Sequence, residues 1–115
     1  MVEFGENMPD ELSLEAVLVW TPDGKPLISV EACWSADDHA AGEKALASLR
    51  GLGKPINDSI GPMSYVALQS AADAGLPAGN NYYAKSGFLP KLDEAGIDEM
   101  VATFLGAKTK FILFV

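Results

Sequence analysis

The residues best suited to chemistry lie in the run Tyr82–Leu89, where a lysine closely follows two tyrosines. In an extended strand Tyr83 and Lys85 would share one face, because alternate side chains point the same way. A lysine between apolar neighbours needs water, a carboxylate or a ligand for its ammonium group, since burying an unpaired charge is costly. Two interpretations stay open on spacing alone: an ammonium group that extends to water, or a lysine that binds a substrate.

Two further polar side chains belong with this run. Glu31 lies midway along another apolar run and is the candidate carboxylate partner of Lys85. Gln69 follows Tyr65 within a short predicted helix, where its amide either caps local backbone or hydrogen-bonds a substrate. The spacing alone assigns neither residue a catalytic role.

Other kinds of chemistry are poorly supported. His39 is the only histidine and Cys33 the only cysteine, which excludes a multi-cysteine metal site and an internal disulfide. No nucleophile motif accompanies His39, which we expect at the surface beside acidic residues that cap a helix. Cys33 lies in an apolar run and is expected to be a buried, unreactive thiol. The chain has no glycine-rich phosphate loop, and a metal site from His39, Asp37 and Asp38 is a weaker interpretation than helix capping, so we expect no cofactor or metal site in the chain itself.

The composition narrows the class of protein. The 115-residue chain has a formal net charge of −8, which argues against binding to a nucleic-acid backbone. No apolar run approaches the roughly 20 residues that span a bilayer, and no basic segment followed by an apolar run marks a secretion signal. We therefore expect a cytoplasmic globular protein without nucleic-acid or membrane partners.

Local signals predict a hairpin in the first part of the chain. Residues Leu12–Thr21 alternate with a period of two, and Leu27–Trp34 form a second apolar run. The five residues 21–25 between them contain Pro and Asp-Gly, which is typical of a tight turn. The second face of the first strand becomes apolar midway, so part of that strand should be covered on both sides. The prediction is an antiparallel hairpin.

Helical spacing and helix-ending residues predict the other elements. A helix is expected over His39–Leu52, capped within Ser35–Asp38, and a second long helix is expected to be capped by Asp93 and to end at Gly106. A short helix is expected over Tyr65–Ala74, and further strands over Tyr82–Leu89 and Phe111–Val115. The strand aromatics are expected in the core: Trp20, Trp34, Tyr82 and Phe88.

These elements predict an α+β fold in the order β-β-α-(short α)-β-α-β, with a mainly antiparallel sheet and two long helices on one face. A ferredoxin-like arrangement fits that order. Residues 1–11 are a predicted N-terminal tail, and residues 12–115 a single domain. The run Phe111–Val115 is too apolar for an exposed edge, so we expect it to pair centrally, to pair with a second copy, or to continue into a missing domain.

Several short motifs occur along the chain, and their order together indicates a relationship to a known family. They include Ile28–Trp34, Gly42–Leu46, Leu49–Pro55, Ala95–Asp98 and, above all, Ile60–Ser70 and Tyr82–Leu89. Together they span most of the chain between Lys25 and Phe104. This ordered set resembles the substrate-side domain of bacterial FAD-linked oxidases of the berberine bridge enzyme-like type, in the vanillyl alcohol oxidase superfamily.

The resemblance implies part of a longer, two-domain flavoenzyme. In such enzymes one domain binds FAD, and a second domain with a broad antiparallel sheet covers the flavin and forms the substrate pocket. Substrates of the family include alcohols, sugars and amines. Carried over by position, Lys85 and Tyr83 would face the pocket, and Gln69 is a further substrate-binding candidate. The catalytic base of many relatives lies downstream, so no catalytic residue is implied here.

The chain also departs from that family. The flavin-binding domain is missing, and neither His39 nor Cys33 matches the motifs for covalent flavin attachment. We therefore expect the chain alone neither to hold FAD tightly nor to turn over substrate, and an FAD-binding domain or subunit to be its partner. The alternative is a stand-alone α+β module that binds a small molecule, or dimerises through its sheet or last strand, without catalysis.

Overall fold

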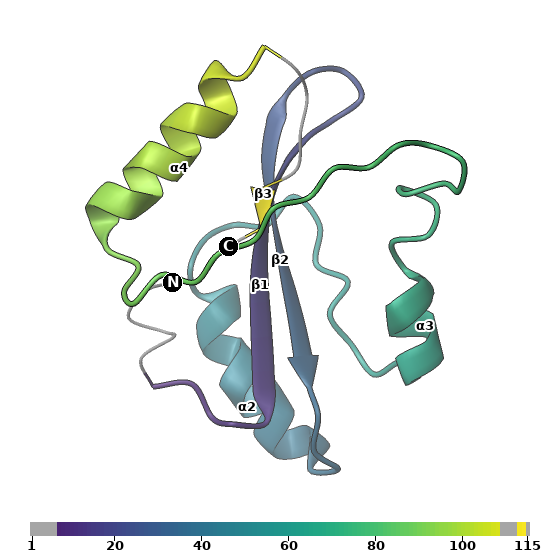
Figure 1. Cartoon of the computed structure of the whole chain (residues 1–115). Helices are drawn as coiled ribbons and strands as arrows, with labels where there is room; N and C mark the ends of the chain where they lie inside the picture. The colour runs from purple at the N-terminus through teal and green to yellow at the C-terminus, as the bar shows by residue number, and fades with distance from the viewer. Residues whose placement is uncertain (1–6, 109–112, 115) are drawn as a thin grey trace. The chain divides into compact units, whose positions relative to one another are not determined.

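The computed structural model describes residues 7–108 and 113–114 (Figure 1). They divide into two compact units: the sheet unit, residues up to 56 and from 91 onward, and the loop unit, residues 57–90. The α+β class is confirmed. The elements are β1 (Leu12–Trp20), β2 (Pro26–Trp34), α2 (His39–Arg50), α3 (Tyr65–Ser70), α4 (Glu94–Gly106) and β3 (Leu113–Phe114).

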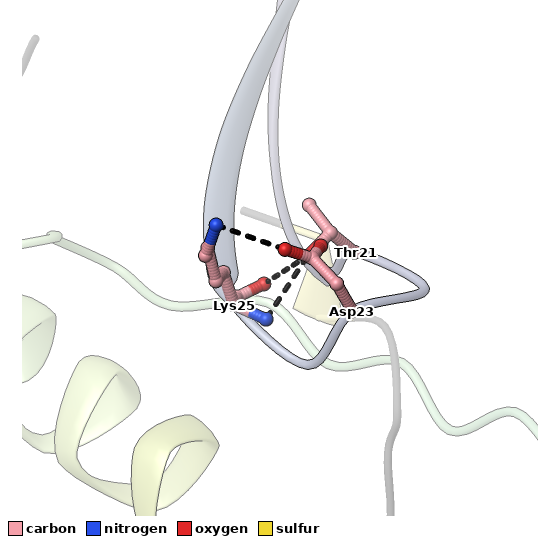
Figure 2. Close-up of polar contacts among 3 residues, drawn as sticks. All are labelled: Thr21, Asp23 and Lys25. Carbon is pink, nitrogen blue, oxygen red and sulfur yellow. Dashed lines mark hydrogen bonds and ion pairs between the residues drawn. The ribbon is translucent and has the colours of Figure 1, made fainter.

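A tight turn joins β1 to β2, as predicted. Gly24 adopts a φ of 83°, a conformation that glycine tolerates far better than residues with a Cβ. The Thr21 hydroxyl donates to the Asp23 carboxylate at 2.6 Å and accepts from the Lys25 amide at 2.9 Å (Figure 2). The Lys25 ammonium group lies 2.9 Å from the same carboxylate. Side chains and a glycine thus fix the turn that sets the register of the hairpin.

The two long strands pair antiparallel over their full lengths, from Leu12 opposite Trp34 to Trp20 opposite Pro26. β3 pairs antiparallel with the other edge of β1 at Val17 and Leu18, which gives the order β2-β1-β3. β1 is therefore the central strand of the described sheet. Its adjacent residues Ala16 and Val17, which point to opposite faces, are each only 4% exposed, so part of β1 is covered on both sides as expected.

Both long helices pack against one face of the hairpin. In α2 the backbone at Gly42 lies against the Trp34 ring, and in α4 Phe104 stacks on Trp20 with ring centroids 4.9 Å apart. The register places Trp20 and Trp34 on the same face. Both rings pack against a helix, as expected of core aromatics, but the two side chains are half-buried rather than buried. Among the described residues of this unit, the buried apolar ones are Leu12, Ala16, Val17, Leu46, Leu49 and Phe104.

The predicted helix caps are confirmed. Asp38 accepts from the Ala41 amide at 3.0 Å at the start of α2, and Asp93 accepts from the Gly96 amide at 2.9 Å at the start of α4. The helix α2 ends at Arg50, two residues before its predicted end, so Leu52 lies beyond it and is 53% exposed.

The predicted strand Tyr82–Leu89 is wrong. These residues have no regular secondary structure, and no strand of the described sheet pairs with them. Tyr82 and Phe88, which were expected in the core, are 55% and 105% exposed. Alternating apolar and polar residues favour a strand because one face can then be buried in a sheet. That preference cannot form a strand where no partner strand is available.

Two other predictions are modified. The short helix ends at Ser70 rather than at Ala74, and turns continue to Gly75. Of the predicted strand Phe111–Val115, Leu113 and Phe114 form β3, while residues 111, 112 and 115 lie outside the described part of the chain. The described order is thus β-β-α-α-α-β, with a smaller sheet than expected.

Candidate functional site

All three candidate substrate-binding residues belong to the loop unit. Gln69 lies on α3, and Tyr83 and Lys85 lie on the segment that follows the turns after this helix. All three side chains are exposed. The loop unit therefore presents these groups openly, rather than enclosing them in a core.

Lys85 and Tyr83 lie close together. The Lys85 Nζ is 5.9 Å from the centroid of the Tyr83 ring, near the outer limit of a cation–π contact. At exposed sites such contacts contribute about 0.5–1 kcal/mol. The pair places a positive charge and a phenolic hydroxyl within one short segment, where they can bind one ligand together.

A local network fixes the chain just before this pair. The Tyr82 hydroxyl donates to the Pro77 carbonyl at 2.8 Å and lies 3.3 Å from the Asn80 side-chain amide. Gly79, within this loop, has a φ of 94°. Tyr82 therefore closes a loop instead of filling a core. The Pro, Gly and Asn residues before it were the sequence signal for this role, since they favour turns.

Gln69 is less well placed. Ser64 caps its helix, accepting from the Ala67 amide at 3.2 Å, so Gln69 is not the capping residue. Within the described residues its side chain makes no hydrogen bond, and no polar contact joins it to Tyr83 or Lys85. The structure thus pairs two of the three candidates and leaves the third apart.

Most large apolar side chains of the loop unit are exposed to solvent. Ile60 and Leu68 are the residues of this unit that reach intermediate burial, and the others are exposed. The unit carries few charges: Asp58, Asp73 and Lys85. Apolar surface that a short segment cannot bury in its own core is typical of an interaction site. The exposed large residues are Met63, Tyr65, Val66, Leu76, Tyr82, Tyr83, Phe88 and Leu89.

Glu31, the suggested partner of Lys85, lies in the sheet unit. It pairs across the strands with Glu15, and both side chains are exposed. Since Lys85 belongs to the loop unit, an ion pair between Lys85 and Glu31 stays a prediction.

The other polar candidates occupy structural positions. His39 is the exposed first residue of α2, as expected, and Asp38 beside it is the helix cap. Cys33 is half-buried rather than buried. Within residues 7–108 and 113–114 no three His, Cys, Asp or Glu side chains gather in a way that could hold a metal ion. In the same residues no helix is long and apolar enough to cross a membrane.

No protein-family model, curated protein or solved structure matches this chain. The resemblance to FAD-linked oxidases therefore rests on the residue motifs alone. The features that bear on function are the exposed Tyr83–Lys85 pair and the exposed apolar side chains of the same loop unit.

Proposed function

We propose that this chain is the substrate-side segment of an FAD-linked oxidoreductase, catalytically incomplete without an FAD-binding polypeptide. The ordered motifs from Ile28 to Asp98 support the relationship. The structural observation that supports the incompleteness is the exposure of the large apolar side chains of the loop unit, which also carries the two candidate residues.

The exposed side chains give a reason for a partner. Tyr83, Val66 and Phe88 are 82%, 74% and 105% exposed. Burying an apolar side chain of this size contributes about 1.5–3 kcal/mol, so covering several of them would stabilise a complex substantially. An FAD-binding polypeptide that closes over the substrate side of the enzyme would provide such a cover.

The chain itself does not fit FAD. It has no glycine-rich loop for the pyrophosphate. The groups that it does offer suit a substrate: the Lys85 ammonium is a compact donor for an anionic oxygen, and the Tyr83 hydroxyl both donates and accepts hydrogen bonds. We assign these two residues the binding and orientation of an oxygen-bearing substrate.

The second candidate function is a stand-alone module without catalysis. The sheet unit favours it, because Leu12, Ala16 and Phe104 form a buried core and Asp38 and Asp93 cap its helices. Two finer features stay predictions under either function: a ferredoxin-like arrangement of the sheet and helices, and a cytoplasmic location.

Docking to a flavin domain tests the first proposal. The chain is titrated into the FAD-binding domain of a berberine bridge enzyme-like oxidase produced without its own substrate-side domain, and binding is followed by calorimetry and by the flavin absorption spectrum. We expect binding that the Phe88→Ser variant weakens at least tenfold, since about 1.4 kcal/mol of lost apolar burial has that effect.

The control is Leu52→Ser, which removes a half-exposed apolar side chain from the sheet unit. It should bind like the unchanged chain. Failure to bind any of several such flavin domains, or equal effects of the two substitutions, would contradict the proposal.

A further inference from the structure

The outer edge of β2 carries backbone hydrogen-bonding groups that no other described residue pairs with, and they form a self-complementary pattern. We propose that two copies of this chain pair through this edge, antiparallel about Val30, to form one continuous sheet. This inference is independent of the relationship to FAD-linked oxidases, because it depends only on the geometry of the hairpin.

Two hydrogen bonds show which groups are free. At the turn the Thr21 amide donates to the Lys25 carbonyl at 2.8 Å, and at the other end the Ser35 amide donates to the Glu11 carbonyl at 2.9 Å. Hydrogen-bonded and non-hydrogen-bonded pairs alternate along an antiparallel ladder. The register between these two ends is uninterrupted, so the odd-numbered residues of β2 bond to β1. The even-numbered residues therefore direct their amides and carbonyls away from β1: Ile28, Val30, Ala32 and Trp34.

Nothing in the described sheet occupies that edge. The strand order is β2-β1-β3, so β2 has a neighbour on one side. Within the part of the chain that the structure describes, the amides of Ile28, Val30 and Ala32 donate no backbone hydrogen bond outside the sheet. The edge offers a run of donors and acceptors to another strand.

β2 also lacks the features by which proteins usually protect an edge. Natural edges carry bulges, lysines, or prolines within the strand. This strand has an uninterrupted register and no Lys or Arg, and its proline, Pro26, stands at the first position. Its single charged residue, Glu31, directs its backbone groups toward β1. An unprotected edge of this length is a site for strand addition.

The arrangement of residues along β2 favours a second copy of the same strand as its partner. Val30 is the midpoint of Pro26–Trp34 and carries free edge groups, so a twofold axis there pairs the strand along its full length. Ile28 would lie opposite Ala32 of the second copy, a large side chain beside a small one. Ser29 would lie opposite Glu31 of the second copy, which keeps the two Glu31 carboxylates from facing each other. Moving the twofold axis by one residue, to Glu31, would place the two Glu31 carboxylates directly opposite each other, which is destabilising.

A charge-exchange series tests this register. Sedimentation equilibrium gives the dimer dissociation constant of the full chain, and circular dichroism shows whether each variant folds. Ser29→Glu would place like charges opposite each other twice, and we expect it to raise the dissociation constant about tenfold. Adding Glu31→Lys to that variant should restore or improve dimerisation, because each facing pair then has opposite charges.

The matched control is Ser13→Glu, which adds the same charge to the same sheet face away from the proposed axis. It should leave the dissociation constant within about twofold, since isolated surface charges contribute little. A monomer at all concentrations, equal weakening by Ser13→Glu and Ser29→Glu, or no rescue by Glu31→Lys would overturn the proposal.

Amide hydrogen exchange provides a second readout that needs no substitution. The amides of Ile28, Val30 and Ala32 should exchange quickly in dilute samples and slowly in concentrated ones, while those of Ser29 and Glu31 stay protected at both. Protection of the even-numbered amides that does not depend on concentration would show that the chain's own residues or another molecule cover the edge, and would also overturn the proposal.

Discussion

Gly42 lies so close to the indole ring of Trp34 that a Cβ at position 42 would be 2.8 Å from two ring carbons. This contact lets α2 approach the sheet near the end of β2. A glycine inside a helix lowers helix stability by up to about 1 kcal/mol relative to alanine. At position 42 the close packing of α2 on the Trp34 ring offsets that loss. The packing of α2 on the hairpin therefore depends on the missing side chain.

Gly42→Ala should destabilise the protein despite its better helix propensity. Overpacking a core contact costs about 1–3 kcal/mol, which exceeds the gain in propensity. We expect a net loss of about 1–2 kcal/mol in the free energy of unfolding, measured by urea denaturation. Gly106→Ala, at the end of α4 where the added methyl group meets no atom of the described residues within 4 Å, should be neutral or stabilising. Equal effects of the two changes would contradict the tight contact.

The aromatic stack between Trp20 and Phe104 should hold α4 on the sheet. Phe104 is 1% exposed, and removing a buried aromatic side chain costs about 3–5 kcal/mol. A double-mutant cycle of Phe104→Ala and Trp20→Ala should give a coupling energy of about 0.5–1.5 kcal/mol. Strictly additive effects would show that the two rings contribute separately, through burial alone.

The turn at Gly24 offers a test of the hairpin. Because its φ is 83°, Gly24→Ala forces an alanine into the left-handed region and should cost about 1–2 kcal/mol. Gly53→Ala, where the added methyl group meets no atom and φ is not positive, should change the free energy of unfolding by less than about 0.5 kcal/mol. A neutral Gly24→Ala variant would contradict the observed turn.

The parts of the fold that could be predicted from the sequence are those set by short-range signals. The turn at Gly24 and the caps at Asp38 and Asp93 were found because their signals act within a few residues. The strand Tyr82–Leu89 was not, because alternation gives no information on whether a partner strand exists. Tyr83 and Lys85 lie close together although the strand that was expected to hold them on one face does not form, and the role of Tyr82 in closing its loop depends on a hydrogen bond to Pro77.

The cross-strand pair Glu15 and Glu31 should cost stability. Like charges directly opposite each other on adjacent strands are destabilising by about 0.2–1 kcal/mol. Glu31→Gln should therefore raise the free energy of unfolding, and more so in dilute salt, since the repulsion of exposed charges is screened. Asp98→Asn, on the exposed part of α4, is the control and should have a smaller effect. A decrease in stability with Glu31→Gln would contradict the prediction.

Lys85 and Tyr83 should be dispensable for folding if their role is to bind a ligand. Both are exposed, so Lys85→Met and Tyr83→Ser should each change the free energy of unfolding of the isolated chain by less than about 0.5 kcal/mol. Thermal and urea unfolding measure this directly. A loss of 2 kcal/mol or more would mean that the pair is part of a folded core.

The most direct test of the proposed function is the state of the protein in the cells that make it. The chain is isolated through an antibody against its own sequence, and the mass, identity and flavin absorption of everything joined or bound to it are determined. We predict an FAD-binding polypeptide, either continuous with the chain or held by the loop unit. A colourless 12.1 kDa protein without such a polypeptide would contradict the proposal and favour the stand-alone module.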